Sequence, residues 1–180
     1  MDPSFIGPFK RPRLTPSQIR RTDIANIAKT VMGEAEDQGP VGMEAVGRVI
    51  RNRYDQGRGR SFTEVINDPK QFTIWNNKLK DRAQAIGRMR PGQGNPQFDE
   101  AYEVAKRVYY DTVPYVHDEV GDVAMDADLY YNPKKASPKW AKHKKVPYLG
   151  TIGDHNFHRD YNRTPKPGTI SGTLRYRGGK

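Results

Sequence analysis

The chain contains no cysteine among its 180 residues. This absence excludes a disulfide framework, a zinc site built on thiolates and a cysteine nucleophile, and it leaves the cellular compartment open. Apolar residues are also scarce, since they make up 34% of the chain and the mean hydropathy is −0.92. The length is sufficient for one domain with a buried core, and the low hydropathy predicts that part of the chain is extended.

Long apolar runs are missing as well. No stretch of about 20 apolar residues occurs, and the N-terminus lacks the apolar segment of a signal peptide. We therefore expect no membrane span and assign no compartment. If the target lies outside a cytoplasmic membrane, another agent must deliver the protein to it.

Acidic residues are outnumbered, with 21 Asp and Glu against 31 Lys and Arg, for a formal net charge of +10. The bases gather at the N-terminus, in a lysine-rich segment over 134–145 and beyond residue 163, whereas 111–128 contains neither Lys nor Arg. Such a surplus attracts polyanions: nucleic acid, anionic lipid or an anionic cell wall. For any single lysine, solubility is the more ordinary explanation.

Apolar residues recur at helical spacing over the first two thirds of the chain. Thr15 and Pro16 fit an N-cap followed by proline at the first helical position. Ser61 with Glu64 fits a capping box at the start of a short helix. The expected helices cover about 16–33, 41–54, 61–66 and 98–110.

The last third of the folded region has a different pattern. Residues 127–131 and 149–157 favour short strands, and the glycines and prolines of 76–97 predict a long loop. Helices followed by a small irregular β part indicate an α+β fold. The expected organisation is an extended basic arm over 1–14, one domain over 15–162 and a basic flexible tail over 163–180.

Glu34 is the candidate catalytic residue, at the end of the first predicted helix and next to Gly33. Packed helices on both sides would hold the carboxyl still and partly dry, which raises its pKa and suits a general acid near neutral pH. Gly33 would give a substrate backbone-level access to the carboxyl. Considered alone, an exposed helix-terminal glutamate is the simpler explanation.

Two later segments combine aromatic rings with amide and hydroxyl side chains, one over 71–75 and one over 129–140. Rings stack on the apolar faces of sugars, while amides pair with hydroxyl and N-acetyl groups. Either segment could instead be a loop whose aromatic residues anchor it to the core. The candidate substrate-binding residues are Gln71, Phe72, Thr73, Trp75, Tyr131, Asn132 and Trp140.

His155 and His158, next to Asp154, raise the possibility of a metal site. The chain has no HExxH motif and no third ligand at an expected spacing. A histidine held by backbone or aromatic neighbours is far commoner. We therefore predict no metal and no cofactor.

Five short motifs occur in order between about residues 24 and 158. They are Gly33-Glu34-Ala35, Val46 with Asn52-Arg53, Gln71-Phe72-Thr73 with Trp75, Tyr131-Asn132-Pro133 with Trp140, and Ile152-Gly153 with His155 and Phe157. Together they resemble the SleB/CwlJ-type cell wall hydrolase family, the catalytic domain of spore cortex-lytic enzymes, which also occurs in phage muralytic proteins. On this ground His155 joins the candidate substrate-binding residues.

The resemblance implies a small lysozyme-like α+β domain that acts on peptidoglycan glycan strands. It also implies lytic transglycosylase chemistry after N-acetylmuramic acid, with Glu34 as the catalytic residue. The family often carries a second acid four residues later, where this chain has Gln38. A hydrolase normally needs two carboxylates, whereas a transglycosylase can use one. The residues themselves leave open which bond is cut and whether the product is anhydro or hydrated.

Two other classes remain as alternatives. A nucleic-acid-binding protein fits the basic charge and interleaved aromatics, but no helix-turn-helix, zinc-knuckle or RNP signature is present. A structural virion protein on a degenerate hydrolase fold is the third class, and the intact Gly33-Glu34 pair argues against it. We expect a monomer that binds peptidoglycan strands and the anionic cell wall surface, delivered by a phage virion or by host machinery.

Overall fold

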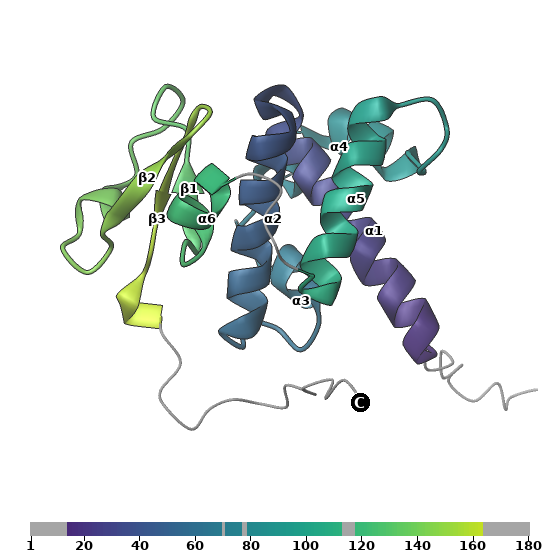
Figure 1. Cartoon of the computed structure of the whole chain (residues 1–180), viewed down its shortest axis with the longest axis horizontal. Helices are drawn as coiled ribbons and strands as arrows, with labels where there is room; N and C mark the ends of the chain where they lie inside the picture. The colour runs from purple at the N-terminus through teal and green to yellow at the C-terminus, as the bar shows by residue number, and fades with distance from the viewer. Residues whose placement is uncertain (1–13, 70, 77–78, 113–117, 164–180) are drawn as a thin grey trace, which may run out of the picture.

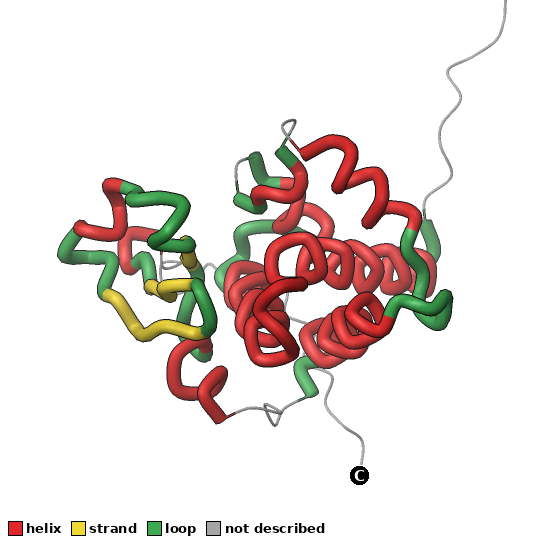
Figure 2. Tube along the Cα trace, turned by 90° about the horizontal axis from the view of Figure 1, so that it is seen from above, coloured by secondary structure: helices red, strands yellow, loops and turns green. Residues whose placement is uncertain are grey.

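The computed structural model describes residues 14–69, 71–76, 79–112 and 118–163. A group of helices lies beside a smaller part that contains the sheet, as Figure 1 shows from the front and Figure 2 from above. The helices are α1 (Pro16–Ala35), α2 (Gly39–Asp55), α3 (Phe62–Asn67), α4 (Lys80–Arg88), α5 (Pro96–Tyr110) and α6 (Asp118–Ala124). The strands are β1 (Leu129–Tyr131), β2 (Tyr148–Ile152) and β3 (His155–His158). Short 3₁₀ turns within the described residues include η1 (Glu36–Gln38), η2 (Thr73–Trp75), η4 (Lys139–Lys142) and η5 (Tyr161–Arg163).

Helix α1 begins where the sequence predicts. The Thr15 side chain accepts a hydrogen bond from the Gln18 backbone, and the Gln18 side chain accepts one from the Thr15 backbone. This capping box and the proline at the first turn satisfy donors that a helix start leaves free. The helix ends at Ala35, and η1 leads directly into α2. Glu34 therefore lies in the last turn of α1.

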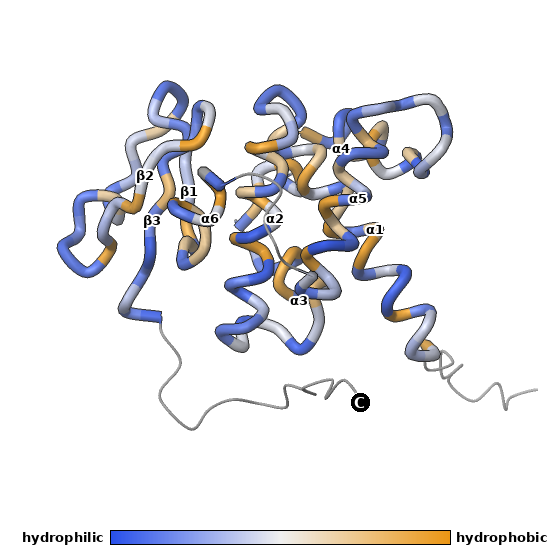
Figure 3. Tube along the Cα trace, in the orientation of Figure 1, coloured by the Kyte–Doolittle hydropathy of each residue, from blue (hydrophilic) through white to orange (hydrophobic). Residues whose placement is uncertain are grey.

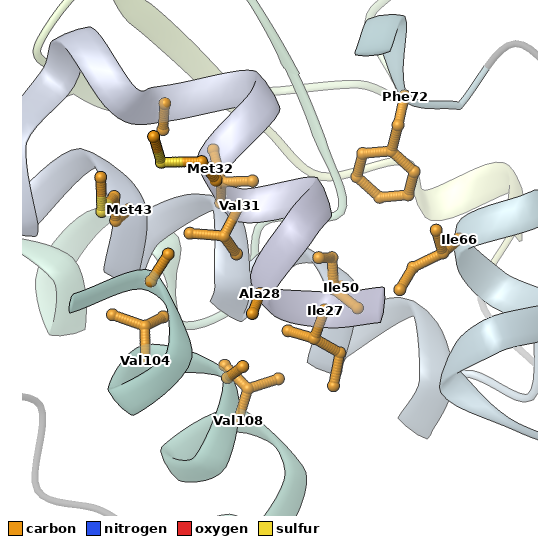
Figure 4. Close-up of a cluster of buried hydrophobic side chains, with 14 of the residues drawn as sticks. Ile27, Ala28, Val31, Met32, Met43, Ile50, Ile66, Phe72, Val104 and Val108 are labelled. Atoms are coloured by element: carbon orange, nitrogen blue, oxygen red, sulfur yellow. The ribbon is translucent and has the colours of Figure 1, made fainter. Parts of the chain in front are cut away.

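The main hydrophobic core forms around α1 (Figure 4). Ile27 and Val31 of α1 are fully buried against residues of α2 and α5, among them Ile50 and Val104. Each such side chain stabilises the fold by about 2 kcal/mol relative to exposure. Phe72, which precedes η2, belongs to the same cluster and is only 2% exposed.

The prediction of a long loop over 76–97 is wrong. This stretch contains α4, and α5 begins at Pro96 with its N-cap at Asn95. Only one residue of α4, Ile86, is buried, so the helix lacks the apolar stripe by which a sequence reveals a helix. The sequence pattern does not predict α6 either. Its buried residues Val120 and Ala124 lie among acidic residues and glycine, so no apolar stripe is visible.

The three strands form an antiparallel sheet in the order β1-β3-β2. Tyr130 pairs with Phe157, and Leu129 pairs with His158. Side chains alternate between the two faces of a strand, so Tyr130 and Phe157 share the face that packs on the helices. Tyr131 lies on the opposite face of β1. The sheet thus presents one aromatic face to the helices and another away from them.

These elements confirm a mainly helical α+β fold with a short β part. The basic arm over 1–14 and the tail over 163–180 fall almost wholly outside the described residues, so these boundaries stay predictions. Within the described part of the chain, no helix combines the length and the apolar character of a membrane span.

Candidate active site

Two donors from distant segments hold the Glu34 carboxyl. The backbone N–H of Ile74, in η2, donates to Oε1 at 2.7 Å. The hydroxyl of Tyr130, in β1, donates to Oε2 at 2.9 Å. Three segments that are remote in sequence therefore meet at this one side chain.

Burial is the main cause that raises the pKa of Glu34. The bonds from Ile74 and Tyr130 and the positive charge of Arg53 oppose this shift without cancelling it. The pKa of Tyr130 lies well above its ordinary value, because its hydroxyl is buried and faces the Glu34 carboxyl. Tyr130 consequently stays protonated and remains a donor at neutral pH.

Gly33 determines how closely η2 approaches α1. A Cβ at this position would lie 2.7 Å from Cβ of Ile74, which is fully buried. The glycine therefore leaves room for the Ile74 side chain, and this contact brings the Ile74 N–H to Glu34. Ile74 fills the space where a Gly33 side chain would lie, so substrate access at Gly33 stays a prediction.

Arg53, in α2, contacts both of the segments that supply donors to Glu34. Its Nε donates to the carbonyl of Asp128 at 2.7 Å, two residues before Tyr130. Its guanidinium carbon lies 4.9 Å from the ring centroid of Phe72, two residues before Ile74. Burial lowers the pKa of Arg53 to about 10, so the side chain remains charged at neutral pH.

Neighbouring residues reinforce the link between α2 and the start of β1. Asn52 Nδ2 donates to the carbonyls of Ala124 and Ala127, at 3.0 and 2.7 Å. Arg58 pairs with the fully buried carboxylate of Asp128 at 2.6 Å. The sequence assigns no role to the motif Asn52-Arg53. In the structure, its side chains form hydrogen bonds that connect α2 to the segment before β1.

The predicted residues over 71–75 lie in the segment that supplies the Ile74 donor. Thr73 is exposed and Gln71 is half-buried. Trp75 is 36% exposed, and its Nε1 donates to Thr30 Oγ1 at 3.0 Å. A hollow of about 460 Å³ adjoins this segment. Its lining consists of Ile66, Asn67, Asp68, Pro69, Phe72, Trp75 and Asn76.

Glu34 is not among the residues that line this hollow. The Glu34 carboxyl remains the candidate catalytic group, since acid-base chemistry requires a held titratable group and a hollow alone supplies none. The hollow borders the segment 71–75, whose backbone reaches the carboxyl.

Two predicted residues do not offer their side chains to a ligand at Glu34. Phe72 lies in the core beneath Arg53. Asn132 is 8% exposed, and its Oδ1 accepts a hydrogen bond from the Lys134 backbone at 2.9 Å. Asn132 therefore closes a turn in this structure.

Tyr131 and Trp140 pack together, with ring centroids 5.5 Å apart. They lie on the face of the sheet opposite to Tyr130, so they do not line a cleft around Glu34. Because side chains alternate along β1, Tyr130 is the residue that reaches the Glu34 carboxyl. The sequence pattern predicts its neighbour Tyr131 as the site residue. The sequence does not distinguish Tyr130 from Tyr131, because the choice depends on which face of β1 packs on the helices.

His155 lies beside Tyr130, with ring centroids 5.2 Å apart in an edge-to-face arrangement. Burial lowers its pKa, so the ring is neutral near pH 7, and its buried Nδ1 has no partner among the described residues. His158 lies on the other face of β3. Among the described residues, no group of three or more His, Cys, Asp or Glu side chains is arranged to hold a metal ion.

The comparisons with known proteins agree with this fold. The profile of the family described as Cell Wall Hydrolase matches residues 37–158, more than half of the chain. The fold is similar to that of the catalytic domain of the germination-specific lytic transglycosylase SleB from Bacillus anthracis, with a TM-score of 0.54 and 24% identity. The match covers 77% of this chain and 95% of that one. No curated protein matches the chain. Glu34 precedes the family match by three residues, so its assignment rests on its geometry.

Proposed function

Since the chain belongs to the cell wall hydrolase family, whose substrate is peptidoglycan, we propose that it is a lytic transglycosylase with Glu34 as its one acid and base. The observation that carries the proposal is the partly buried Glu34 carboxyl, with a raised pKa and two fixed donors. The similarity in fold to a lytic transglycosylase supports it. Residues 15–162 would form the catalytic domain.

The proposed reaction uses the Glu34 carboxyl twice, first as an acid and then as a base. Protonated Glu34 donates to the glycosidic oxygen that follows an N-acetylmuramic acid residue, and the C1–O bond breaks. The resulting carboxylate takes the proton of the 6-hydroxyl of the same sugar, and O6 bonds to C1. The product carries a 1,6-anhydro ring, Glu34 is protonated again, and no water is consumed. Because the 6-hydroxyl and C1 belong to the same sugar, this closure is intramolecular, and holding the two atoms in line favours it.

The two donors suit the carboxylate stage of this cycle. Ile74 and Tyr130 each occupy one acceptor position on a different oxygen of Glu34. Each carboxylate oxygen has a second lone pair, which remains for the substrate proton. Because the donors stabilise the anion, they oppose the rise in pKa that burial causes, and the net shift remains upward, as a group that must give a proton and take one back requires.

A two-carboxylate hydrolase is the competing mechanism. Position 38 carries an amide that cannot act as a base, and its Oε1 accepts a hydrogen bond from the Asp154 backbone at 2.7 Å. Gln38 therefore anchors the turn between β2 and β3. Asp37, exposed and bonded to the Gln38 amide, is the candidate for the second acid of a hydrolytic mechanism.

We further propose that the substrate lies along the segment 71–75. Trp75 would stack on a sugar ring, since its indole is exposed and is held in orientation by Thr30. Gln71 and Thr73 would pair with hydroxyl or N-acetyl groups. His155, neutral and adjacent to Tyr130, would accept or donate one further hydrogen bond.

Mass spectrometry of the fragments released from purified peptidoglycan tests the proposal. We expect anhydro-muramic ends from the wild type and no release by Glu34→Gln. Reducing ends would replace the transglycosylase by a two-carboxylate hydrolase. Release by Glu34→Gln at the wild-type rate would remove Glu34 from the mechanism.

A further inference from the structure

Four aromatic rings gather on the face of the sheet that points away from the helices. Tyr131, Trp140 and His158 lie mutually 5.4 to 5.6 Å apart, centroid to centroid. Tyr148 lies 5.5 Å from His158. We call these four residues the outer aromatic face. It draws on β1, β2, β3 and η4, and it is separate from the Glu34 site.

A β-bulge adds Tyr148 to this face. Tyr148 pairs with His158 and Gly150 pairs with Phe157, so β2 has one more residue than β3 between these pairs. Simple alternation from the buried Ile152 would direct Tyr148 towards the helices. The bulge instead turns it outwards, as bulges characteristically re-aim a side chain. Tyr148 is 55% exposed as a result.

The edge of the ring cluster is polar. The Tyr148 hydroxyl lies 2.6 Å from Oγ1 of Thr151, which donates to Oδ1 of Asn156 at 2.8 Å. An exposed aromatic ring with hydroxyl and amide groups beside it fits a pyranose, because the ring covers the apolar C–H face and the polar groups meet the hydroxyls.

The surrounding surface is strongly basic. Residues 127–163 carry eight Lys and Arg and three Asp. Each of the three acids is already in an ion pair, with Arg58, Lys134 or Arg163. The exposed Lys139 and Lys142 lie in the same turn as Trp140 and form no ion pair with any described residue. The segment between β1 and β2, which contains them, is mostly hydrophilic in Figure 3.

We propose that the outer aromatic face binds a second peptidoglycan strand, distinct from the one cleaved at Glu34. This inference rests on the proposed function. Tyr148 would stack on a sugar ring, and Lys139 and Lys142 would pair with carboxylates of the same strand. A phosphate polymer of the wall would satisfy the lysines but offers no flat apolar face to the tyrosine.

Two sites on opposite faces of one sheet cannot hold adjacent sugars of one straight strand. In a wall made of many strands, the second contact keeps the enzyme close to uncleaved strands and raises the effective concentration of glycan at the active site. Its electrostatic part should weaken as salt screens the lysines.

The test measures co-sedimentation of the full chain with peptidoglycan sacculi stripped of other wall polymers. All proteins carry Glu34→Gln so that the sacculi stay intact. We expect Tyr148→Ala and the double variant Lys139→Gln/Lys142→Gln each to weaken binding about threefold or more. Tyr148→Phe should bind like the parent, which separates ring stacking from the hydroxyl contact.

The matched control is Arg21→Gln/Lys80→Gln, which removes the same charge from exposed positions on the helices. Equal weakening by this control, or none by the test variants, would overturn the proposal. Weakening seen only on sacculi that retain their phosphate polymers would assign the face to those polymers. Circular dichroism of each variant verifies that it is folded.

A second measurement separates this inference from the proposed function. In the catalytically intact chain, Tyr148→Ala and Lys139→Gln/Lys142→Gln should cleave short soluble glycans at the wild-type rate. If the wild type cleaves none, the proposed function fails and the sedimentation result still decides whether the face binds. A proportional loss on soluble glycans would place these residues in the active site and overturn the second-strand assignment.

Discussion

The Tyr130 hydroxyl donates a 2.9 Å hydrogen bond to Oε2 of Glu34, across 96 positions of sequence. Tyr130 packs against both hydrophobic clusters, the one around α1 and the one beneath the sheet. The bond therefore spans the junction of the two parts of the molecule. Any shift of the sheet relative to the helices would change the environment of the carboxyl.

Removing the tyrosine hydroxyl should lower activity and move its pH dependence. Tyr130→Phe deletes a donor that lowers the pKa of Glu34, so that pKa should rise further. The fall in kcat/KM with increasing pH should then occur at higher pH, with a rate lower by about tenfold. Tyr131→Phe is the matched control, because its ring lies on the other face. Identical profiles for Tyr130→Phe and the wild type would contradict the assigned contact.

Glu34→Gln should change stability in a pH-dependent direction. The folded-state pKa of Glu34 is raised, so the stability it contributes is present at low pH and is lost as pH rises through that pKa. The free energy of unfolding of the variant, relative to that of the wild type, should therefore increase as the pH is raised from about 4 to about 8. Urea unfolding at both pH values measures the difference. A constant difference would mean that the carboxyl is not desolvated.

Gly33→Ala should damage both stability and catalysis. The new methyl would lie 2.7 Å from Cβ of Ile74, and overpacking of this kind costs about 1–3 kcal/mol. Gly87→Ala, within α4 and with open space around the Cβ, is the control and should be neutral or stabilising. Thermal unfolding and turnover are the measurements. A Gly33→Ala variant with the thermal stability of the wild type would contradict the proposed contact with Ile74.

Arg53 acts as a positioning residue for the Glu34 carboxyl. Arg53→Gln removes a charge that lowers the pKa of Glu34, so the fall of activity with pH should move to higher pH. The bond to the Asp128 carbonyl is also lost, at a cost of about 1–3 kcal/mol. Arg53→Lys keeps the charge and should restore the pH profile more fully than the stability. A purely structural role would leave the profile of both variants unchanged.

Asp37→Asn tests whether a second carboxylate takes part. A one-acid mechanism predicts near wild-type turnover and anhydro products, since the oxygen of the introduced amide can still accept the hydrogen bond from Gln38. Gln38→Glu should likewise keep its bond from the Asp154 backbone and leave the products unchanged. Loss of turnover in Asp37→Asn as complete as in Glu34→Gln would establish a two-carboxylate mechanism.

Local sequence determined the features that depend on neighbours along the chain. The cap at Thr15 and the apolar spacing of α1, α2 and α5 were sufficient to predict these helices and to place Glu34 at a helix end. The charge and the lack of cysteine follow from composition. These are effects of backbone geometry and hydrophobic period, which act over a few residues.

The tertiary structure alone decided what meets the carboxyl. Alternation on β1 makes Tyr130 the partner of Glu34 and places Tyr131 on the outer face, and a one-residue change of register would exchange them. Phe72 became core and Gly33 a contact for Ile74, because packing distances between remote segments set both roles. Such contacts depend on how elements dock, and the spacing of residues within one element does not encode that.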